Sequence, residues 1–164
     1  MKQQDLKLSA HFNLREFVFD PMAFRYGIDN YPPAPVIDNL VRMAKLLEFA
    51  RTAFNKPPMI ISGYRCLELN RWHQSSDKSS HIKGLGVDFV LRNEDIGKAA
   101  LTLAVLMDRA FYPYDQIILE YAWIHISLAE TGTTPRTMKL TKPGKDSPWI
   151  QGIHPSKISV SIPR

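Results

Sequence analysis

The chain has 164 residues, of which 45% are hydrophobic and 23% charged, and these values exclude an intrinsically disordered protein. Its net charge of +5 favours an anionic partner, but it has no Lys/Arg block and no basic-aromatic repeat, so we expect no nucleic acid partner. The single cysteine, Cys66, excludes an internal disulfide. No apolar run has the length of a signal peptide or a membrane span, so we expect synthesis in the cytoplasm and no membrane partner.

Helices are predicted for the first third of the chain. Asn13 is the predicted N-cap of a short helix over residues 14–19, and Glu16 stands where a capping box requires an acid. A second short helix ends at Gly27. Apolar residues then recur at helical spacing, which predicts a long amphipathic helix over residues 34–55.

Short strands dominate the remainder. They are predicted at residues 59–62, 87–91, 116–120, 123–128 and near 136–140. A helix capped by Asn93 and ending near Phe111 separates the second strand from the third, and the reversal at Tyr121 and Ala122 makes the third and fourth a hairpin.

The order of these elements predicts an α+β fold. Its sheet is small and mainly antiparallel, with helices packed on one face. We expect one domain over residues 1–140. Residues 141–164 are rich in Pro, Gly, Ser and Lys, and we expect an extended or partly disordered tail there.

Two segments carry residues that bind metals. His81 lies in a polar loop, Asp88 lies in the strand that follows, and His125 is the centre of the fourth strand. Side chains alternate along a strand, so if Ile124 and Ile126 enter the core, Asp88 and His125 share the opposite sheet face. Two histidines and a carboxylate are the ligands of a catalytic zinc that keeps a fourth position open. The pattern therefore predicts one Zn²⁺ ion, and the alternative is a purely structural role for these residues.

Several short motifs follow one another in a characteristic order. They are Leu8-Ser9-Ala10-His11-Phe12, Leu14-Arg15-Glu16-Phe17, Gly27-Ile28-Asp29-Asn30, Ser62-Gly63-Tyr64-Arg65, Leu69-Asn70, Ser79-Ser80-His81, Gly84, Asp88-Phe89 and Trp123-Ile124-His125-Ile126-Ser127. In these motifs, over roughly residues 8–128, the chain resembles the M15 peptidases, the zinc D-Ala-D-Ala carboxypeptidases and peptidoglycan endopeptidases, and in particular their compact bacterial and phage branch.

The resemblance implies roles for four of these residues. His81, Asp88 and His125 match the zinc ligands of the family. Arg65 matches an arginine beside the site that holds a substrate carbonyl or carboxylate, a task for which a planar guanidinium with two parallel donors is suited. The alternative for Arg65 is an ion pair that only orders the end of its strand.

The general base departs from the pattern of the family. Many relatives have an acidic residue three positions before the last histidine, where this chain has Ala122. We assign the role to Glu120, the nearest carboxylate. Alternation places Glu120 on the same face as Ile118, although the turn that follows can redirect its side chain. The reserve candidates are Asp115, Asp77 and Glu130.

The substrate groove also differs from that of the relatives. Gln74 and Ser75 replace a usual Gly-Gly pair, which should change the shape of the groove. The candidate substrate-binding residues are Tyr64, Ser79, Trp123, Ser127 and His73. For His73 the alternative is an exposed loop histidine, and for Trp123 it is a place in the core.

The resemblance implies zinc-dependent hydrolysis of a peptide bond in peptidoglycan stem peptides, which are the expected partner. Without a signal peptide, such an enzyme would be a phage or prophage lysis enzyme released to the wall, or part of a virion. The alternative is a non-catalytic zinc-binding structural or wall-binding virion protein, which Ala122 and the altered loop at Gln74 and Ser75 favour. The sequence leaves the oligomeric state open, and we expect a monomer.

Overall fold

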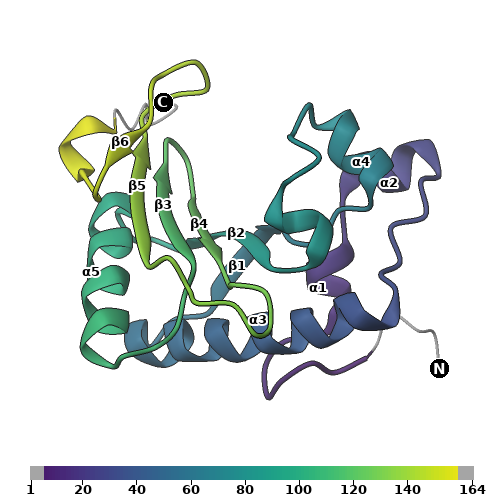
Figure 1. Cartoon of the computed structure of the whole chain (residues 1–164), viewed down its shortest axis with the longest axis horizontal. Helices are drawn as coiled ribbons and strands as arrows, with labels where there is room; N and C mark the ends of the chain where they lie inside the picture. Colours follow the sequence, from purple (N-terminus) through teal and green to yellow (C-terminus); the bar gives the residue numbers. More distant parts are fainter. Residues whose placement is uncertain (1–5, 159–164) are drawn as a thin grey trace.

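A computed structural model describes residues 6–158, which form one six-stranded sheet with helices against it (Figure 1). The strands are β1 (Pro58–Ser62), β2 (Gly86–Leu91), β3 (Gln116–Glu120), β4 (Ile124–Ser127), β5 (Met138–Lys142) and β6 (Ile150–Gln151). Their order is β1-β2-β4-β3-β5-β6, and every neighbouring pair is antiparallel except β3 and β5. The α+β prediction is therefore confirmed.

The helices follow local signals in the sequence. They are α1 (Leu14–Val18), α2 (Pro21–Tyr26), α3 (Ala34–Phe54), α4 (Leu67–Trp72) and α5 (Ile96–Arg109), with short 3₁₀ helices η2 (Ser80–Lys83) and η3 (Pro155–Lys157). The capping box of Asn13 and Glu16 is present at α1. Asp20 caps α2, accepting a hydrogen bond from the Met22 amide at 2.7 Å, and Gly27 ends that helix at a φ of 66°.

The N-cap of α5 differs from the prediction. Asp95, not Asn93, accepts a hydrogen bond from the backbone amide of Lys98 at 2.8 Å. Asn93 instead has a φ of 60° in the turn that follows β2. A capping side chain must directly precede the first helical residue, and the turn after β2 delays that residue to Ile96.

The core lies between the sheet and the long helices. Figure 1 shows α3 running beneath the sheet, with α5 beside β3 and β5. Val87, Phe89, Ile124 and Ile126 are fully buried on the helix-facing side. Asp88 and His125 therefore project from the opposite face, as alternation predicts. No helix in residues 6–158 is long and apolar enough to cross a membrane.

The segment after residue 140 folds onto the domain. The expected boundary falls inside β5, and β6 pairs antiparallel with that strand. Thr141 is fully buried and donates a hydrogen bond to the Gly152 carbonyl at 2.7 Å, while Ile158 joins the core. The segment expected to be an extended tail is thus folded as far as residue 158. Single contacts such as those of Thr141 and Ile158 hold it in place, and such contacts leave no periodic pattern in the sequence. Residues 159–164 lie outside the described part.

Candidate metal centre

Three side chains from different segments meet on the face of the sheet opposite the long helices. Asp88 on β2 pairs directly with His125 on β4, and η2 brings His81 from the preceding loop. Asp88 Oδ1 lies 2.7 Å from His125 Nδ1 and 3.4 Å from His81 Nε2. The candidate ligand atoms all lie within 4.8 Å of one another, and the three residues are buried.

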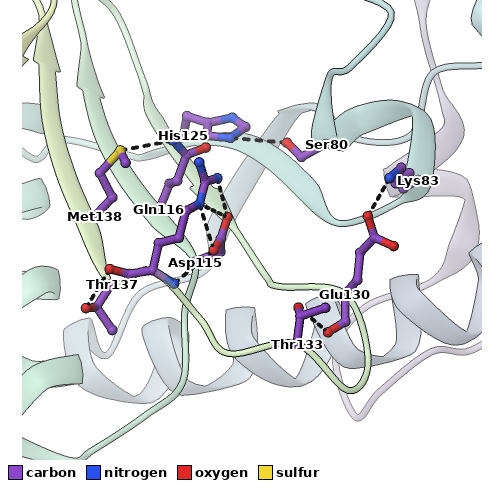
Figure 2. Close-up of polar contacts among 10 residues, drawn as sticks. Ser80, Lys83, Asp115, Gln116, His125, Glu130, Thr133, Thr137 and Met138 are labelled. Carbon is purple, nitrogen blue, oxygen red and sulfur yellow. Dashed lines mark hydrogen bonds and ion pairs between the residues drawn. The ribbon is translucent and has the colours of Figure 1, made fainter.

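Neighbouring groups orient both imidazoles. His81 Nδ1 donates a hydrogen bond to the carbonyl oxygen of Gly63 at 2.7 Å, which leaves the Nε2 lone pair directed at the site. His125 presents Nδ1 to Asp88, and its Nε2 lies 3.4 Å from the Ser80 hydroxyl (Figure 2). In His81 the nitrogen that points away from Asp88 is thus held by Gly63, and in His125 the nitrogen that points away from Asp88 is held by Ser80.

Two glycines make this approach possible. A Cβ at Gly63 would lie 2.3 Å from the carbonyl oxygen of Phe17, and one at Gly86 would lie 2.2 Å from Ser80 Oγ. Such distances are too short for real contacts, so a larger residue at position 63 would displace the backbone at Phe17, and one at position 86 would displace the side chains of Ser80 and His125. Both glycines serve close packing rather than a turn.

The protonation states suit metal binding. Burial alone would raise the pKa of Asp88, but the charges and hydrogen bonds of the two histidines outweigh it and hold that pKa far below its ordinary range. Burial lowers the pKa of His81. An ionised carboxylate and a neutral imidazole are the forms that coordinate a cation. The two nitrogens and one oxygen therefore fit a divalent ion such as zinc.

Arg65 lies beside the three residues with donors to spare. Its guanidinium is buried, and Nη1 donates to the Ser62 hydroxyl at 3.0 Å. Its Nε has no hydrogen-bond partner among the described residues. Arg65 also lines the cavity over the site, and its guanidinium carries five N–H donors in a planar fork, which suits it to bind a substrate oxygen.

Glu120 is the carboxylate placed to act at the site. It ends β3, two residues after Ile118, which lies opposite His125, so its side chain shares their sheet face. Burial and the charge of Asp88 raise the pKa of Glu120. No hydrogen bond or ion pair to its side chain occurs within residues 6–158. It is therefore free to accept a proton.

The reserve carboxylates are all engaged in ion pairs. Asp115 binds the side chain and the backbone amide of Arg136, the latter at 3.0 Å. Glu130 pairs with Lys83, and Figure 2 shows this pair apart from the contact between His125 and Ser80. Asp77 is exposed and pairs with Arg71 at 2.7 Å. Each of the three would have to break an ion pair to act as a base.

A cavity of about 1040 Å³ opens over the site. Besides the candidate ligands, Arg65 and Glu120, its lining includes three predicted substrate-binding residues, Ser79, Trp123 and His73. His73 is also held by Asp20, with 2.8 Å between Nε2 and Oδ2.

Two of the predicted substrate-binding residues lie elsewhere. Tyr64 and Ser127 are buried and do not line the cavity. Tyr64 belongs to the hydrophobic core, because its strand end packs against α1. Ser127 shares the face of His125, but it is buried and its hydroxyl has no hydrogen-bond partner among the described residues.

Sequence reasoning missed several cavity residues that follow β4, among them one aromatic and two basic side chains. These three are Arg136, Lys145 and Trp149. The only available signal was a tryptophan in a segment otherwise rich in Pro, Gly and Lys, where an aromatic side chain has no core to enter.

Comparison with protein families places the chain. Residues 10–127 match the family model described as Peptidase M15. The chain belongs to the M15 peptidase family. A search of curated proteins finds no match. M15 peptidases are metal-dependent, and the matched region contains His81, Asp88 and His125, which agrees with the donor set described above. Strands β5 and β6 lie outside the match, and the branch within the M15 family stays a prediction.

Proposed function

We propose that this M15 peptidase uses one zinc ion to hydrolyse a peptide bond in the stem peptides of bacterial peptidoglycan, as a D-Ala-D-Ala carboxypeptidase or an endopeptidase. The observation that carries the proposal is the convergence of His81, Asp88 and His125 beneath a cavity that also contains Arg65 and Glu120. A structural metal site is normally closed by four protein ligands, whereas three ligands under an open cavity leave a position for reactants.

The metal and the side chains have separate tasks. When bound, a zinc ion supplies Lewis acidity, which polarises a carbonyl and makes a nearby water more acidic. Glu120 accepts the proton of the attacking water and returns it to the leaving amine. The guanidinium of Arg65, which lines the same cavity, hydrogen-bonds the oxygen that becomes negative during attack. His81 and His125 remain fixed by Gly63 and Ser80 throughout.

Charge supports a wall substrate. The chain carries a net charge of +5, and its cavity lining includes Lys78 and Lys145. Stem peptides and teichoic acids carry carboxylates and phosphates, which complement this charge. We further propose a setting in phage or prophage lysis, or in a virion that opens the wall.

A second candidate function is a zinc-binding wall or virion protein without catalysis. Ala122 favours it, because the position that holds an acid in many relatives has no carboxylate here. The position of Glu120 favours the enzyme, since that side chain lines the same cavity as the three ligands.

Digestion of purified peptidoglycan distinguishes the two. The zinc-loaded protein is incubated with walls of different cross-link chemistry, and released peptides are identified by mass spectrometry, with an EDTA-treated sample as control. The proposal predicts one type of new peptide terminus that EDTA abolishes. Zinc-loaded protein that binds walls yet releases nothing from any of them would support the non-catalytic candidate.

A further inference from the structure

The hairpin of β5 and β6 reaches the active-site cavity from outside the region that matches the family. Strand β5 runs parallel to β3, and Lys142 lies in register with Glu120. The connection between β5 and β6, residues 143–149, contributes Lys145 and Trp149 to the cavity lining. Figure 1 shows this connection extending beyond the ends of β3 and β5.

The base of this hairpin is firmly anchored. The backbone amide of Gly152 donates to the Lys139 carbonyl at 2.8 Å, and Thr141 Oγ1 accepts from the His154 amide at 2.9 Å. Next to it, η3 packs on α5, where a Cβ at Gly97 would lie 2.8 Å from Pro155 Cβ. A segment held this closely at its base presents its loop in a defined place.

Trp149 is held beside the cavity rather than buried. Its side chain is 55% exposed, and the Lys142 ammonium lies over its ring, 4.9 Å from the centroid. Lys142 also donates to the carbonyl oxygen of Ser147 in the same loop. The cation–π contact covers one face of the indole and restricts its orientation.

We propose that Trp149 is a substrate-binding residue, whose free indole face packs on an aliphatic side chain or peptide plane of an extended peptide bound across the metal centre. The inference rests on the proposed function and adds a specificity element that the family match does not contain. A large aromatic ring that borders a catalytic cavity gains apolar contact only when a ligand covers it. Such rings are the side chains that most often dominate binding energy.

The test compares tryptophans of similar exposure. Trp72 is 48% exposed, stacks on Tyr26 and does not line the active-site cavity, so Trp72→Ala is the matched control. Hydrolysis of soluble muropeptides by the zinc-loaded parent, Trp149→Ala, Trp149→Phe and Trp72→Ala proteins gives kcat and KM. Circular dichroism melting verifies that each variant is folded.

Trp149→Ala is expected to raise KM roughly tenfold, which corresponds to about 1.4 kcal/mol, with kcat changed less than twofold. Trp149→Phe retains a ring and should fall between the alanine variant and the parent, and Trp72→Ala should match the parent. An unchanged KM in Trp149→Ala, or an equal rise in Trp72→Ala, would overturn the inference while leaving the enzyme intact. A zinc-loaded parent that hydrolyses no muropeptide would instead refute the proposed function, and the inference with it.

Discussion

Replacing Glu120 with glutamine removes the proposed proton acceptor and changes little else. Ile118 lies opposite His125, and two further residues of strand place the Cα of Glu120 about 6.8 Å along β3. A glutamate side chain spans much of that distance back toward the metal centre. The amide has the same shape without basicity, so kcat should fall by a factor of ~10² to 10⁴, or about 2.7 to 5.4 kcal/mol in the barrier.

The assay is muropeptide hydrolysis at matched zinc content, with Glu130→Gln as the control. Glu130 lines the same cavity but is exposed and paired with Lys83, so its replacement should leave kcat near that of the parent. Melting should show that Glu120→Gln is at least as stable, because a raised pKa means that folding disfavours the ionised form of Glu120. Full activity of Glu120→Gln with zinc bound would refute the assignment of the base.

Three further predictions concern neighbouring residues. Lys142→Met removes a positive charge that lowers the pKa of Glu120, so the acid limb of the plot of kcat against pH should move to higher pH. An unmoved limb would argue against coupling between Lys142 and Glu120. Gly63→Ala forces a Cβ against the backbone of α1, and denaturant melts should show a loss of about 1–3 kcal/mol together with weaker zinc binding. Asp115→Asn weakens the pair with Arg136, and because the Arg136 side chain is half exposed, the loss at pH 7 should be about 0.5–1 kcal/mol. That pair lowers the pKa of Asp115 in the folded protein, so the stability that the pair adds is fully present above the ordinary aspartate pKa of 3.8. This stability is lost as the pH falls through the lower pKa of the folded state. The melting curves of parent and variant should therefore converge in acid.

Period-two alternation made the metal centre predictable from sequence. The apolar residues Ile124 and Ile126 must both face the core, so His125 between them must point to the opposite face of the sheet, whichever strands pair with β4. The antiparallel register then set Asp88 directly opposite His125. The capping box at Asn13 was equally local, and it too is present.

Other features depended on contacts that no local pattern encodes. Tyr64 follows a strand in a motif that suggests a site, yet packing against α1 buries it. Asn93 and Asp95 are both good caps, and the length of the turn after β2 decided between them. The fold of the last segment depends on single anchors such as Thr141, so the place of Trp149 was not visible in the sequence.

Zinc content measured on the purified protein shows whether His81, Asp88 and His125 together hold a metal ion. The parent protein and four variants are dialysed against trace zinc, and their zinc content is measured by inductively coupled plasma mass spectrometry. Three variants each remove one candidate ligand: His81→Ala, Asp88→Asn and His125→Ala. The fourth, His11→Ala, is the control, because His11 is exposed and lies far from the site in sequence. The parent and the control are expected to hold about one zinc per chain, and each of the three ligand variants is expected to lose most of it. Zinc retained at the parent level in the folded His81→Ala and His125→Ala proteins would contradict this expectation.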